Sequence, residues 1–449
     1  MDPFHAYDIR GIYGSEIDET FAYELGKAVA TKLKAQQVAV GHDMRTSSED
    51  LEKALVNGLV ESGVDVVRLG LVTTPQFYYS LYSGTSDGGI MITASHNPSE
   101  YNGFKVCLEN AAPLYKENGL YELKEFMAKD KWTRVRERHG HVVKRDIRRQ
   151  YVRFFTRVAK ALTGKYHIIT DTGNGTGIRE LEALQEVFGS NLTMTRLYER
   201  LDGMMPHHEC NPIKEEEMAE LKKKLREGSY DFGVGLDGDA DRIVFFLPDG
   251  TMIPPDITTA LLAAHVGNKD DKVVIDVRSS RAVTEKIAAD GLKPTLSIAG
   301  HAYIKDTMKE LDAPFGGEKS GHYFYRSLHY TDSSLMTIIK MLELLDETGE
   351  SLETLAKPLM ERYVSTGEVN YTVTKKKETL EALQREFENE DVKTIDGVSV
   401  YGSEFFFNAR KSNTENLLRV NMEATDEKTL QDVKNRIERV IARTSPGFE

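Results

Sequence analysis

Residues 38–43 read VAVGHD, a short apolar run that ends in a glycine and two polar side chains. A run of this kind is typical of a buried strand. Before it, apolar residues recur at every fourth position between residues 21 and 33, which predicts one face of a helix. After it, residues 51–59 predict a second helix in the same way, and residues 64–67 a second strand. Short strands that alternate with amphipathic helices indicate βαβ units around a mostly parallel sheet.

The same alternation returns twice further along the chain. A charged stretch at residues 129–149 interrupts it, and we interpret this stretch as a domain junction. The elements expected beyond it are strands 166–169, 231–236, 273–275 and 296–298, and helices 181–187, 257–266, 281–290 and 302–311. Three successive blocks of similar size suggest internal duplication.

The pattern changes after about Val364. A helix at 378–388, several strands within 392–408, a strand at 417–423 and a long helix at 426–442 predict an α+β domain. The fold class is therefore α/β, with three mixed α/β domains followed by a smaller C-terminal α+β domain. The expected domains are residues 1–145, 146–250, 251–364 and 365–449.

Composition and charge exclude several classes of protein. The chain has 449 residues with 58 Lys and Arg against 71 Asp and Glu, and this formal net charge of −13 argues against a nucleic-acid binder. A phosphorylated small molecule can still bind where cations gather in one place. Cys107 and Cys210 have neither metal-ligand nor redox spacing. With no secretory signal or membrane span in the sequence, we expect a cytoplasmic protein.

A candidate nucleophile follows the apolar run at residues 90–92. The sequence there is TASHNP, residues 93–98, with Ser95 and His96 at its centre. A strand that ends in small residues and a proline turn holds one hydroxyl at its tip, which is the placement that a nucleophile needs. The alternative is an ordinary serine in a strand-to-helix loop.

Three aspartates occupy alternate positions after the expected strand at 231–236. The loop reads DGDADR, residues 237–242, and its carboxylates can converge on one hard cation such as Mg²⁺. An EF-hand reading fails because Arg242 and Pro248 stand where that loop needs glycine and glutamate. The alternative for the aspartates is a solvated acidic turn. Arg242 itself suits either a phosphate or a salt bridge to an aspartate.

A glycine-rich stretch, GGEKSGH at residues 316–322, carries three hydrogen-bonding side chains. In an extended loop Glu318, Ser320 and His322 would point the same way, which suits neighbouring sugar hydroxyls. The alternative is a flexible surface turn.

The stretch RKSNTE, residues 410–415, ends an expected strand in the last domain. Arginine offers a planar fork for phosphate, and hydroxyl, amide and backbone N–H groups complete an anion cradle. A capped β-turn is the alternative. Near the N-terminus YDIRG, residues 7–11, places Arg10 as another possible phosphate contact. The stretch 171–177 lacks dinucleotide-loop spacing and predicts a turn that enters a helix.

Together these loops supply a hydroxyl nucleophile, carboxylates for Mg²⁺, side chains that bind hydroxyl groups and a phosphate cradle. An enzyme acting on a phosphorylated sugar uses all four, whereas a serine esterase would use neither the cation site nor the cradle. No P-loop string occurs, which argues against a kinase of the P-loop type.

The four loops, in this order, resemble the signature loops of the α-D-phosphohexomutase superfamily. The opening AYDIRG and the later SNTE are most similar to its phosphomannomutase/phosphoglucomutase branch. The resemblance implies three α/β domains of similar topology and a smaller C-terminal domain around a central cleft. His42 and Asn416 depart from residues common in the family, and Asn416 bears on the shape of the phosphate loop.

The resemblance also assigns roles. It implies that Ser95 is the phosphoserine and that Asp237, Asp239 and Asp241 hold Mg²⁺ together with a phosphate oxygen on Ser95. It implies that sugar hydroxyls are read by Glu318, Ser320 and His322, and that the non-reacting phosphate is held by Arg410, Ser412, Asn413 and Thr414. The catalytic residues besides Ser95 would be His96, Lys105 and Arg242. Further contacts with the substrate would come from Tyr7, Arg10 and His301.

The implied activity is reversible phosphoryl transfer between the 1- and 6-positions of a hexose phosphate, mannose or glucose, through a phosphoserine. Mg²⁺ would be the cofactor and a hexose 1,6-bisphosphate the intermediate and activator. The implied partner is a phosphosugar, with no nucleic acid or membrane, and the protein would be a monomer or homodimer. Alternatives are a phosphoglucosamine or phosphopentose mutase, a Mg²⁺-dependent sugar phosphatase, and a sensor without turnover.

Overall fold

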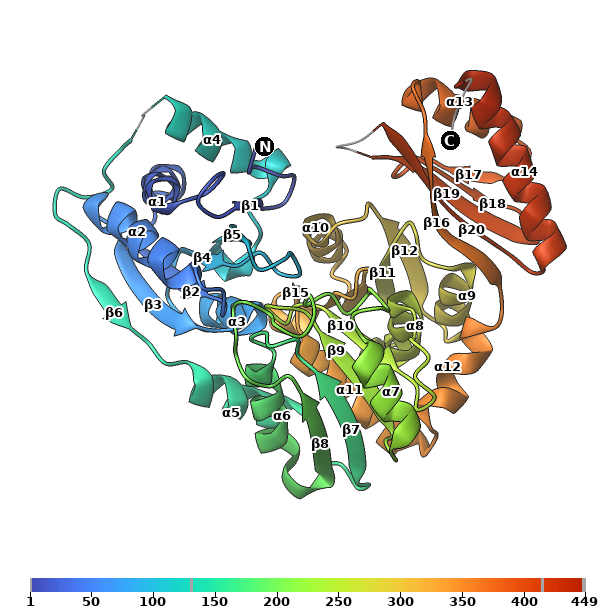
Figure 1. Ribbon diagram of the computed structural model, residues 1–449, viewed down its shortest axis with the longest axis horizontal. Coiled ribbons are helices and arrows are strands. Elements are labelled where there is room, and N and C mark those ends of the chain that lie inside the picture. Colours follow the sequence, from blue (N-terminus) through green and yellow to red (C-terminus); the bar gives the residue numbers. More distant parts are fainter. Residues whose placement is uncertain (1, 130–131, 413–415, 446–449) are drawn as a thin grey trace. The chain divides into compact units, whose positions relative to one another are not determined.

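The computed structural model describes residues 2–129, 132–412 and 416–445. The chain forms two compact units, which are described one at a time (Figure 1). The first unit comprises Met1–Pro255 and Ser320–Leu352, and the second comprises Asp256–Lys319 and Glu353–Glu449. None of the helices in the described ranges has the length and hydropathy of a membrane span.

The first unit begins with a six-stranded sheet in the order β1-β5-β4-β2-β3-β6. Its strands are β1 (Ile9–Ile12), β2 (Gln37–His42), β3 (Asp65–Leu71), β4 (Gly88–Ile92), β5 (Tyr101–Leu108) and β6 (Val142–Lys144). Its helices are α1 (Glu19–Leu33), α2 (Ser48–Glu61), α3 (Thr74–Tyr82) and α4 (Leu120–Ala128). The predicted alternation of helices and strands at residues 21–67 is therefore confirmed.

Helices α1 and α2 lie against each other so closely that only glycine fits where they meet. A Cβ atom on Gly26 would lie 2.4 Å from the carbonyl oxygen of Leu55, and one on Gly58 would lie 2.1 Å from that of Tyr23. Helix α1 begins where the Asp18 side chain accepts a hydrogen bond from the N–H of Phe21. This pair covers the sheet and fixes the strand ends from which the polar loops emerge.

The pairings confirm a mostly parallel sheet, since β4, β2, β3 and β6 pair parallel and the antiparallel pairs are those of β5 with β1 and β4. One feature differs from the sequence-based expectation. The charged stretch expected to be a junction contains the edge strand β6, which pairs parallel with β3. Val142 and Val143 in β6 are exposed, so this strand lacks the buried apolar run by which a strand is recognised in sequence.

A second sheet in the same unit has the order β10-β9-β7-β8. Its strands are β7 (Tyr166–Asp171), β8 (Leu192–Leu197), β9 (Phe232–Leu236) and β10 (Ile243–Phe246). The accompanying helices are α5 (Arg148–Val158), α6 (Ile178–Phe188) and α7 (Ala219–Glu227). Strands β7 and β9 are parallel, and β9 turns back into antiparallel β10 through the aspartate loop. The unit is completed by β14 (Tyr323–Tyr325), β15 (Thr331–Asp332) and α11 (Ser334–Thr348).

The second unit contains two groups of strands. In the first, β11 (Lys272–Asp276) pairs parallel with β12 (Lys293–Ser297) and with β13 (Phe315–Gly317). The helices of this part are α8 (Pro255–Val266), α9 (Arg281–Ala289), α10 (His301–Leu311) and α12 (Leu352–Met360). These elements confirm the predicted third α/β block.

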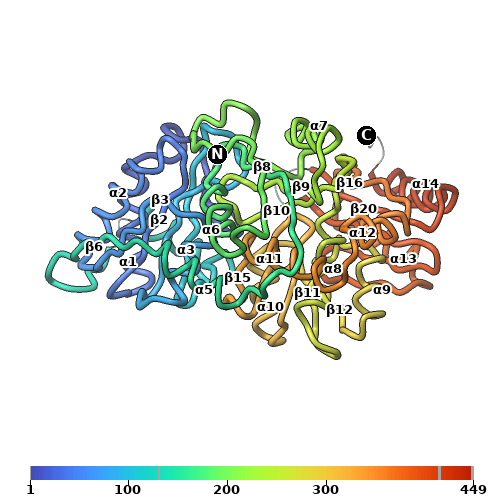
Figure 2. The backbone as a smooth tube through the Cα atoms, turned by 90° about the horizontal axis from the view of Figure 1, so that it is seen from below, coloured from blue at the N-terminus to red at the C-terminus, as the bar shows by residue number. Residues whose placement is uncertain are grey.

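The second group is an antiparallel sheet in the order β16-β20-β19-β18-β17. Its strands are β16 (Val364–Thr372), β17 (Asp391–Lys393), β18 (Val398–Tyr401), β19 (Phe405–Lys411) and β20 (Leu417–Ala424). Helices α13 (Lys376–Glu386) and α14 (Glu427–Thr444) lie side by side and cover it (Figures 1 and 2). The expected apolar face of α14 is buried, which confirms the α+β domain.

Candidate active site

Ser95 lies in the loop between β4 and β5, at the end of a fully buried strand. Its backbone is left-handed, with a φ of 51°, and its N–H donates to the Thr93 hydroxyl at 2.9 Å. A left-handed conformation is uncommon for residues other than glycine and persists only where the surroundings hold it. The residue is 1% exposed. The structure therefore fixes this hydroxyl in a single buried position.

Two side chains contact the Ser95 hydroxyl. Its Oγ donates to Asp237 Oδ2 at 2.7 Å and lies 3.2 Å from Nδ1 of His96. Burial, together with the nearby guanidinium groups of Arg242 and Arg10, lowers the pKa of His96 far below its usual range. The imidazole is therefore neutral, and a neutral imidazole nitrogen can accept a hydrogen bond.

The three aspartates lie in the β9–β10 loop, and all of them are buried. One carboxylate oxygen from each lies within 4.8 Å of the others. Burial rules out the solvated acidic turn that the sequence left open. The cluster is built from Asp237, Asp239 and Asp241, the residues that the sequence pointed to.

Hydrogen bonds from other elements hold the backbone of this loop. The carbonyl oxygen of Gly238 accepts from the N–H and the hydroxyl of Thr176, which precedes α6. The carbonyl oxygen of Ala240 accepts from the Ser334 hydroxyl at 2.7 Å, at the start of α11. Ala240 is itself left-handed, with a φ of 60°. The loop is thereby fixed from two directions in a conformation that brings its carboxylates together.

The aspartates differ in charge state because their neighbours differ. Burial, with the like charges of Asp241 and Asp239, raises the pKa of Asp237 well above its usual range. Burial would also raise the pKa of Asp241, but the nearby Lys105 ammonium and His322 bring it well below the usual range. Lys105 Nζ lies 2.6 Å from Asp239 Oδ2 and 2.5 Å from Asp241 Oδ2. One lysine thus compensates two carboxylates, whereas Asp237 has a longer contact with Arg242, at 3.9 Å.

The cluster fits a hard divalent cation. Asp239 Oδ1 is buried and, within the described ranges, has no hydrogen-bond partner. An unpaired buried carboxylate oxygen is costly unless a cation or donor meets it. Carboxylate oxygens are the ligands that Mg²⁺ prefers. The residues that would hold it are Asp237, Asp239 and Asp241, with Ser95 next to them.

The serine loop and the aspartate loop approach each other through Gly238. A Cβ atom on Gly238 would lie 2.5 Å from the carbonyl oxygen of Ser95, which is closer than atoms can come without displacement. Any larger residue there would push the two loops apart. The glycine of the DGDADR motif is therefore a condition for contact between Ser95 and Asp237.

Three cationic or aromatic residues expected around the reacting group lie in the same unit. Arg242 Nε is buried 3.9 Å from Asp237 Oδ2 and has no hydrogen-bond partner in the described structure. This long contact leaves the guanidinium able to bind an anion as well. Arg10 in β1 contacts Asp8 and donates to Asn97 Oδ1 at 2.7 Å, next to the serine loop. Tyr7 lies half-buried in the bend before β1.

Gly316 and Gly317 of the glycine-rich stretch end β13, but residues 319–321 form a turn, so the expectation of an extended loop is wrong for that part. Gly321 has a φ of 90°, and its carbonyl oxygen accepts from the N–H of Ile243 in β10. Within this turn Ser320 Oγ lies 2.9 Å from His322 Nδ1, and His322 Nε2 lies 3.3 Å from Asp241 Oδ1. A chain that reverses at a left-handed glycine cannot keep the strand-like alternation of side chains. The turn nevertheless brings His322 to the aspartate cluster.

The remaining candidate residues belong to the second unit. Glu318 follows β13 and accepts from Arg278 at 3.3 Å, while His301 begins α10. Arg410 lies near the end of β19 and pairs with Glu368 at 2.9 Å, and Ser412 is buried just beyond that strand. Two further candidates, Asn413 and Thr414, lie outside the described residues.

Sequence reasoning missed two residues that shape the site. Arg45 is buried and forms hydrogen bonds to the carbonyl oxygens of Ser95 and Asn97 at 3.0 and 2.6 Å. Thr74 donates its hydroxyl to Asp239 Oδ2 at 2.6 Å and its N–H to the carbonyl oxygen of Asp239. Both follow the ends of strands in the first sheet. Polar residues just after predicted strands are the signal that could have found them.

Four family models match the chain in order and together cover most of it. They describe the α/β/α domains I, II and III and the C-terminal domain of phosphoglucomutase/phosphomannomutase. The matched residues are 1–134, 149–250, 254–363 and 368–440.

Similar proteins carry related names. The chain is 36% identical to a phosphomannomutase of Methanocaldococcus jannaschii, over 98% of this chain and 97% of the relative. It is 31% identical to an Escherichia coli phosphomannomutase, over 96% and 97% of the two chains. The crystal structure of a phosphoglucomutase/phosphomannomutase family protein from Burkholderia thailandensis superposes with a TM-score of 0.91. That protein is 29% identical, with 100% of this chain and 98% of the other covered.

Proposed function

Because the chain belongs to the phosphoglucomutase/phosphomannomutase branch of the α-D-phosphohexomutases, an isomerase family, we propose the following reaction. The enzyme interconverts the 1- and 6-phosphates of a hexose, mannose or glucose, by way of phosphorylated Ser95. A hexose 1,6-bisphosphate is the intermediate and the activator that phosphorylates the serine.

The proposed reaction has two phosphoryl transfers. In the first, the bond between Ser95 Oγ and phosphorus breaks and Ser95 Oγ takes up a proton, while the free hydroxyl of the hexose monophosphate loses its proton and bonds to the phosphorus. The bisphosphorylated sugar then reverses its orientation. In the second, Ser95 Oγ loses its proton and bonds to the other phosphorus, while the bond between that phosphorus and its sugar oxygen breaks and the sugar oxygen takes up a proton. Enzymes accelerate such transfers mainly by positioning the reacting groups and by compensating the negative charge of the phosphoryl group.

We assign the movement of the proton to His96. Its Nδ1 lies 3.2 Å from Ser95 Oγ, which is within hydrogen-bond reach. Lys105 contacts Asp239 and Asp241 and serves instead to keep the carboxylates in place. Asp237 accepts the hydrogen bond of the unphosphorylated serine and orients its oxygen.

Asp237, Asp239 and Asp241, with an oxygen on Ser95, would hold Mg²⁺, and the ion would supply positive charge near the phosphoryl group that is transferred. Arg242 and Arg10 add guanidinium groups that suit phosphate oxygens. Substrate contacts also come from Tyr7 and His301.

The remaining residues are proposed to hold the rest of the substrate. Sugar hydroxyls are bound by Glu318, Ser320 and His322. Because the bound hydroxyls lie away from the reacting ends, these contacts can form in both orientations of the sugar. They do not depend on the configuration at C2, so both mannose and glucose can bind. The residues proposed for the non-reacting phosphate are Arg410, Ser412, Asn413 and Thr414.

The observation that carries this proposal is the 2.7 Å hydrogen bond between Ser95 Oγ and a buried carboxylate of the aspartate cluster. The test supplies glucose, mannose, glucosamine and ribose 1-phosphates separately, with Mg²⁺ and a catalytic amount of hexose 1,6-bisphosphate. Formation of the hexose 6-phosphates without release of inorganic phosphate supports the mutase. Stoichiometric phosphate release would identify a phosphatase, binding without turnover a sensor, and preference for glucosamine or ribose a different mutase.

We also propose a cytoplasmic location. Both cysteines, Cys107 and Cys210, are buried and neither forms a disulfide, as expected for a protein of a reducing compartment.

A further inference from the structure

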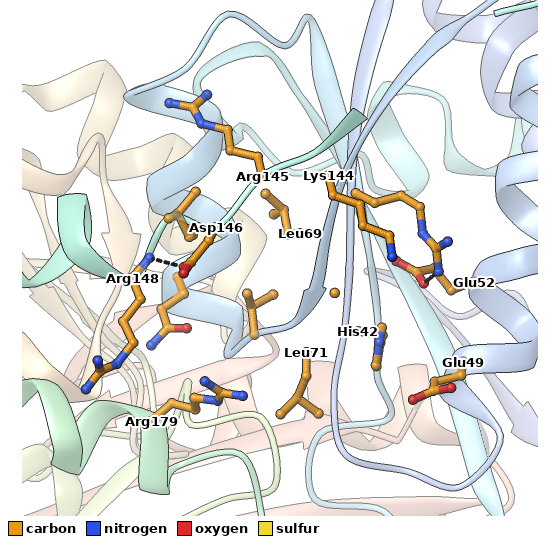
Figure 3. A pocket seen from close by; sticks show the side chains of 15 residues that line it. His42, Glu49, Glu52, Leu69, Leu71, Lys144, Arg145, Asp146, Arg148 and Arg179 are labelled. Atoms are coloured by element: carbon orange, nitrogen blue, oxygen red, sulfur yellow. Dashed lines mark hydrogen bonds and ion pairs between the residues drawn. The ribbon is translucent and has the colours of Figure 1, made fainter. Parts of the chain in front are cut away.

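A cavity in the first unit is lined by residues that the proposed reaction does not use. It has a volume of about 710 Å³ and opens between the ends of β2 and β3, strand β6 and the starts of α5 and α6 (Figure 3). None of the fifteen lining residues belongs to the candidate active site. Cavities of about 300–1,000 Å³ are of the size that binds small metabolites.

The charge of this cavity is opposite to that of the chain. Five of its lining residues are lysine or arginine and three are carboxylates, whereas the whole chain has a net charge of −13. Arg68 pairs with Glu52, and Arg148 pairs outside the cavity with Glu186. An excess of positive charge in one cavity of an acidic protein attracts anions.

Three of the cations that line the cavity are available to bind an anion. Within residues 2–129, 132–412 and 416–445 no ion pair is recorded for Lys144, Arg145 or Arg179. Figure 3 shows Lys144 and Arg145 at the top of the view, on either side of Leu69, and Arg179 at the lower left, beside Leu71. Cations that line one cavity can bind a phosphate group.

The cavity lies next to both loops of the candidate site. His42 lines it, and the residues that follow lead to Arg45, which holds the carbonyl oxygen of Ser95. Val72 also lines it, and two residues later Thr74 holds Asp239. A ligand that shifts the ends of β2 and β3 would thus act on the two segments that position the serine and the aspartates.

From these observations we propose that the cavity is a second binding site, for a small phosphorylated metabolite, and that its occupancy changes turnover at the serine. The phosphate group binds Lys144 and Arg179. The effect on turnover rests on the proposed function, whereas binding does not.

Calorimetry with sorbitol 6-phosphate and the full chain tests the site. Two molecules bind the wild-type chain, one at the candidate active site and one in the cavity. The Lys144→Gln/Arg179→Gln variant binds one, and its KM for glucose 1-phosphate stays within about twofold of wild type because neither residue belongs to the candidate active site. The control variant Arg153→Gln/Arg157→Gln removes the same charge from exposed positions of α5 and still binds two.

Two results would overturn the proposal. They are the same number of binding events in the wild type and in Lys144→Gln/Arg179→Gln, and loss of an event in the control. A wild-type chain that binds one molecule and loses it in the double variant supports the cavity and counts against the candidate active site. Inorganic phosphate is the second probe, and its binding should weaken in the double variant in the same way.

Turnover at saturating glucose 1-phosphate tests the second half of the proposal. Sorbitol 6-phosphate should change kcat by at least about twofold in the wild type and leave the double variant unaffected. Binding without a change in kcat contradicts the effect on turnover. Because calorimetry does not require turnover, its result holds whether or not the proposed mutase activity is found.

Discussion

Ser95 Oγ donates a 2.7 Å hydrogen bond to Asp237 Oδ2, although the two residues are 142 positions apart in the chain. The contact joins the loop after β4 to the loop between β9 and β10, and both loops are buried. It places a candidate nucleophile at the edge of a cluster of three carboxylates that would hold a cation. A phosphoryl group on Ser95 would therefore sit beside that cation.

Removal of the metal should abolish turnover and leave the fold intact. Chelation is expected to lower kcat by about a hundredfold or more, because a metal ion that compensates charge lowers the activation free energy by several kcal/mol. Addition of Mg²⁺ should restore kcat. A second readout is thermal unfolding. Mg²⁺ should raise the Tm of the wild type, because it binds only the folded cluster, and should leave the Tm of Asp237→Asn unchanged. Full activity in the chelated enzyme would contradict the assignment.

The Gly238→Ala variant should separate the two loops. Its Cβ would lie 2.5 Å from the Ser95 carbonyl oxygen, so the serine must move, and we expect kcat to fall by about a hundredfold. The comparison is Gly189→Ala, where the backbone is left-handed with a φ of 53° but no atom lies within 4 Å of the new Cβ. That variant should lose stability and keep its kcat. Equal kcat values in the two variants would argue against a role for the close approach.

Arg45 should be essential to the serine loop. Its guanidinium donates to four carbonyl oxygens, those of Ser95, Asn97, Pro98 and Tyr101, and pairs with Asp43. Arg45→Met would leave these buried groups unpaired and should cost about 3–5 kcal/mol in the free energy of unfolding. Urea unfolding measures this cost, with Arg153→Met at an exposed position of α5 as the control. A loss no larger than that of the control would show that water replaces the guanidinium.

Glu180 should make stability depend on pH. It is buried against Thr73 and Tyr151, and burial raises its pKa from 4.5 to about 7 despite their hydrogen bonds. The folded chain therefore binds more protons than the unfolded chain between these two pKa values. The contribution of Glu180 to the free energy of unfolding is fully present below pH 4.5 and is lost as the pH rises through 7. The loss is on the order of 3 kcal/mol.

The Glu180→Gln variant isolates this effect. Its free energy of unfolding should fall less than that of the wild type between about pH 5 and pH 8, because the amide does not titrate. Unfolding by urea at each pH measures the difference. Parallel pH profiles in the two proteins would mean that Glu180 does not titrate in this range.

Much of the fold could be predicted because its strands are short apolar runs and its helices have one apolar face. Strand β6 could not, since Val142 and Val143 are exposed and its pairing with β3 depends on residues far away in sequence. Strand β5 was missed as well, although its pairing with β1 and β4 makes the first sheet mixed.

The candidate site could be predicted where residues that act together are adjacent in the sequence, as in DGDADR. Two aspects were not. The turn at Gly321 replaces the expected extended loop because its carbonyl oxygen binds β10. Arg45 and Thr74 act through backbone and side-chain contacts with Ser95 and Asp239, and such long-range contacts leave no local pattern in the sequence.

The central claim is that Ser95 carries the phosphoryl group during turnover. The most direct measurement incubates the full chain with a hexose 1,6-bisphosphate and Mg²⁺ and locates the phosphorylated residue by peptide mass spectrometry. We predict a single phosphoryl group on Ser95, which passes to glucose 1-phosphate when that sugar is added. A phosphoryl group on a different residue, or undiminished turnover by Ser95→Ala, would contradict the account.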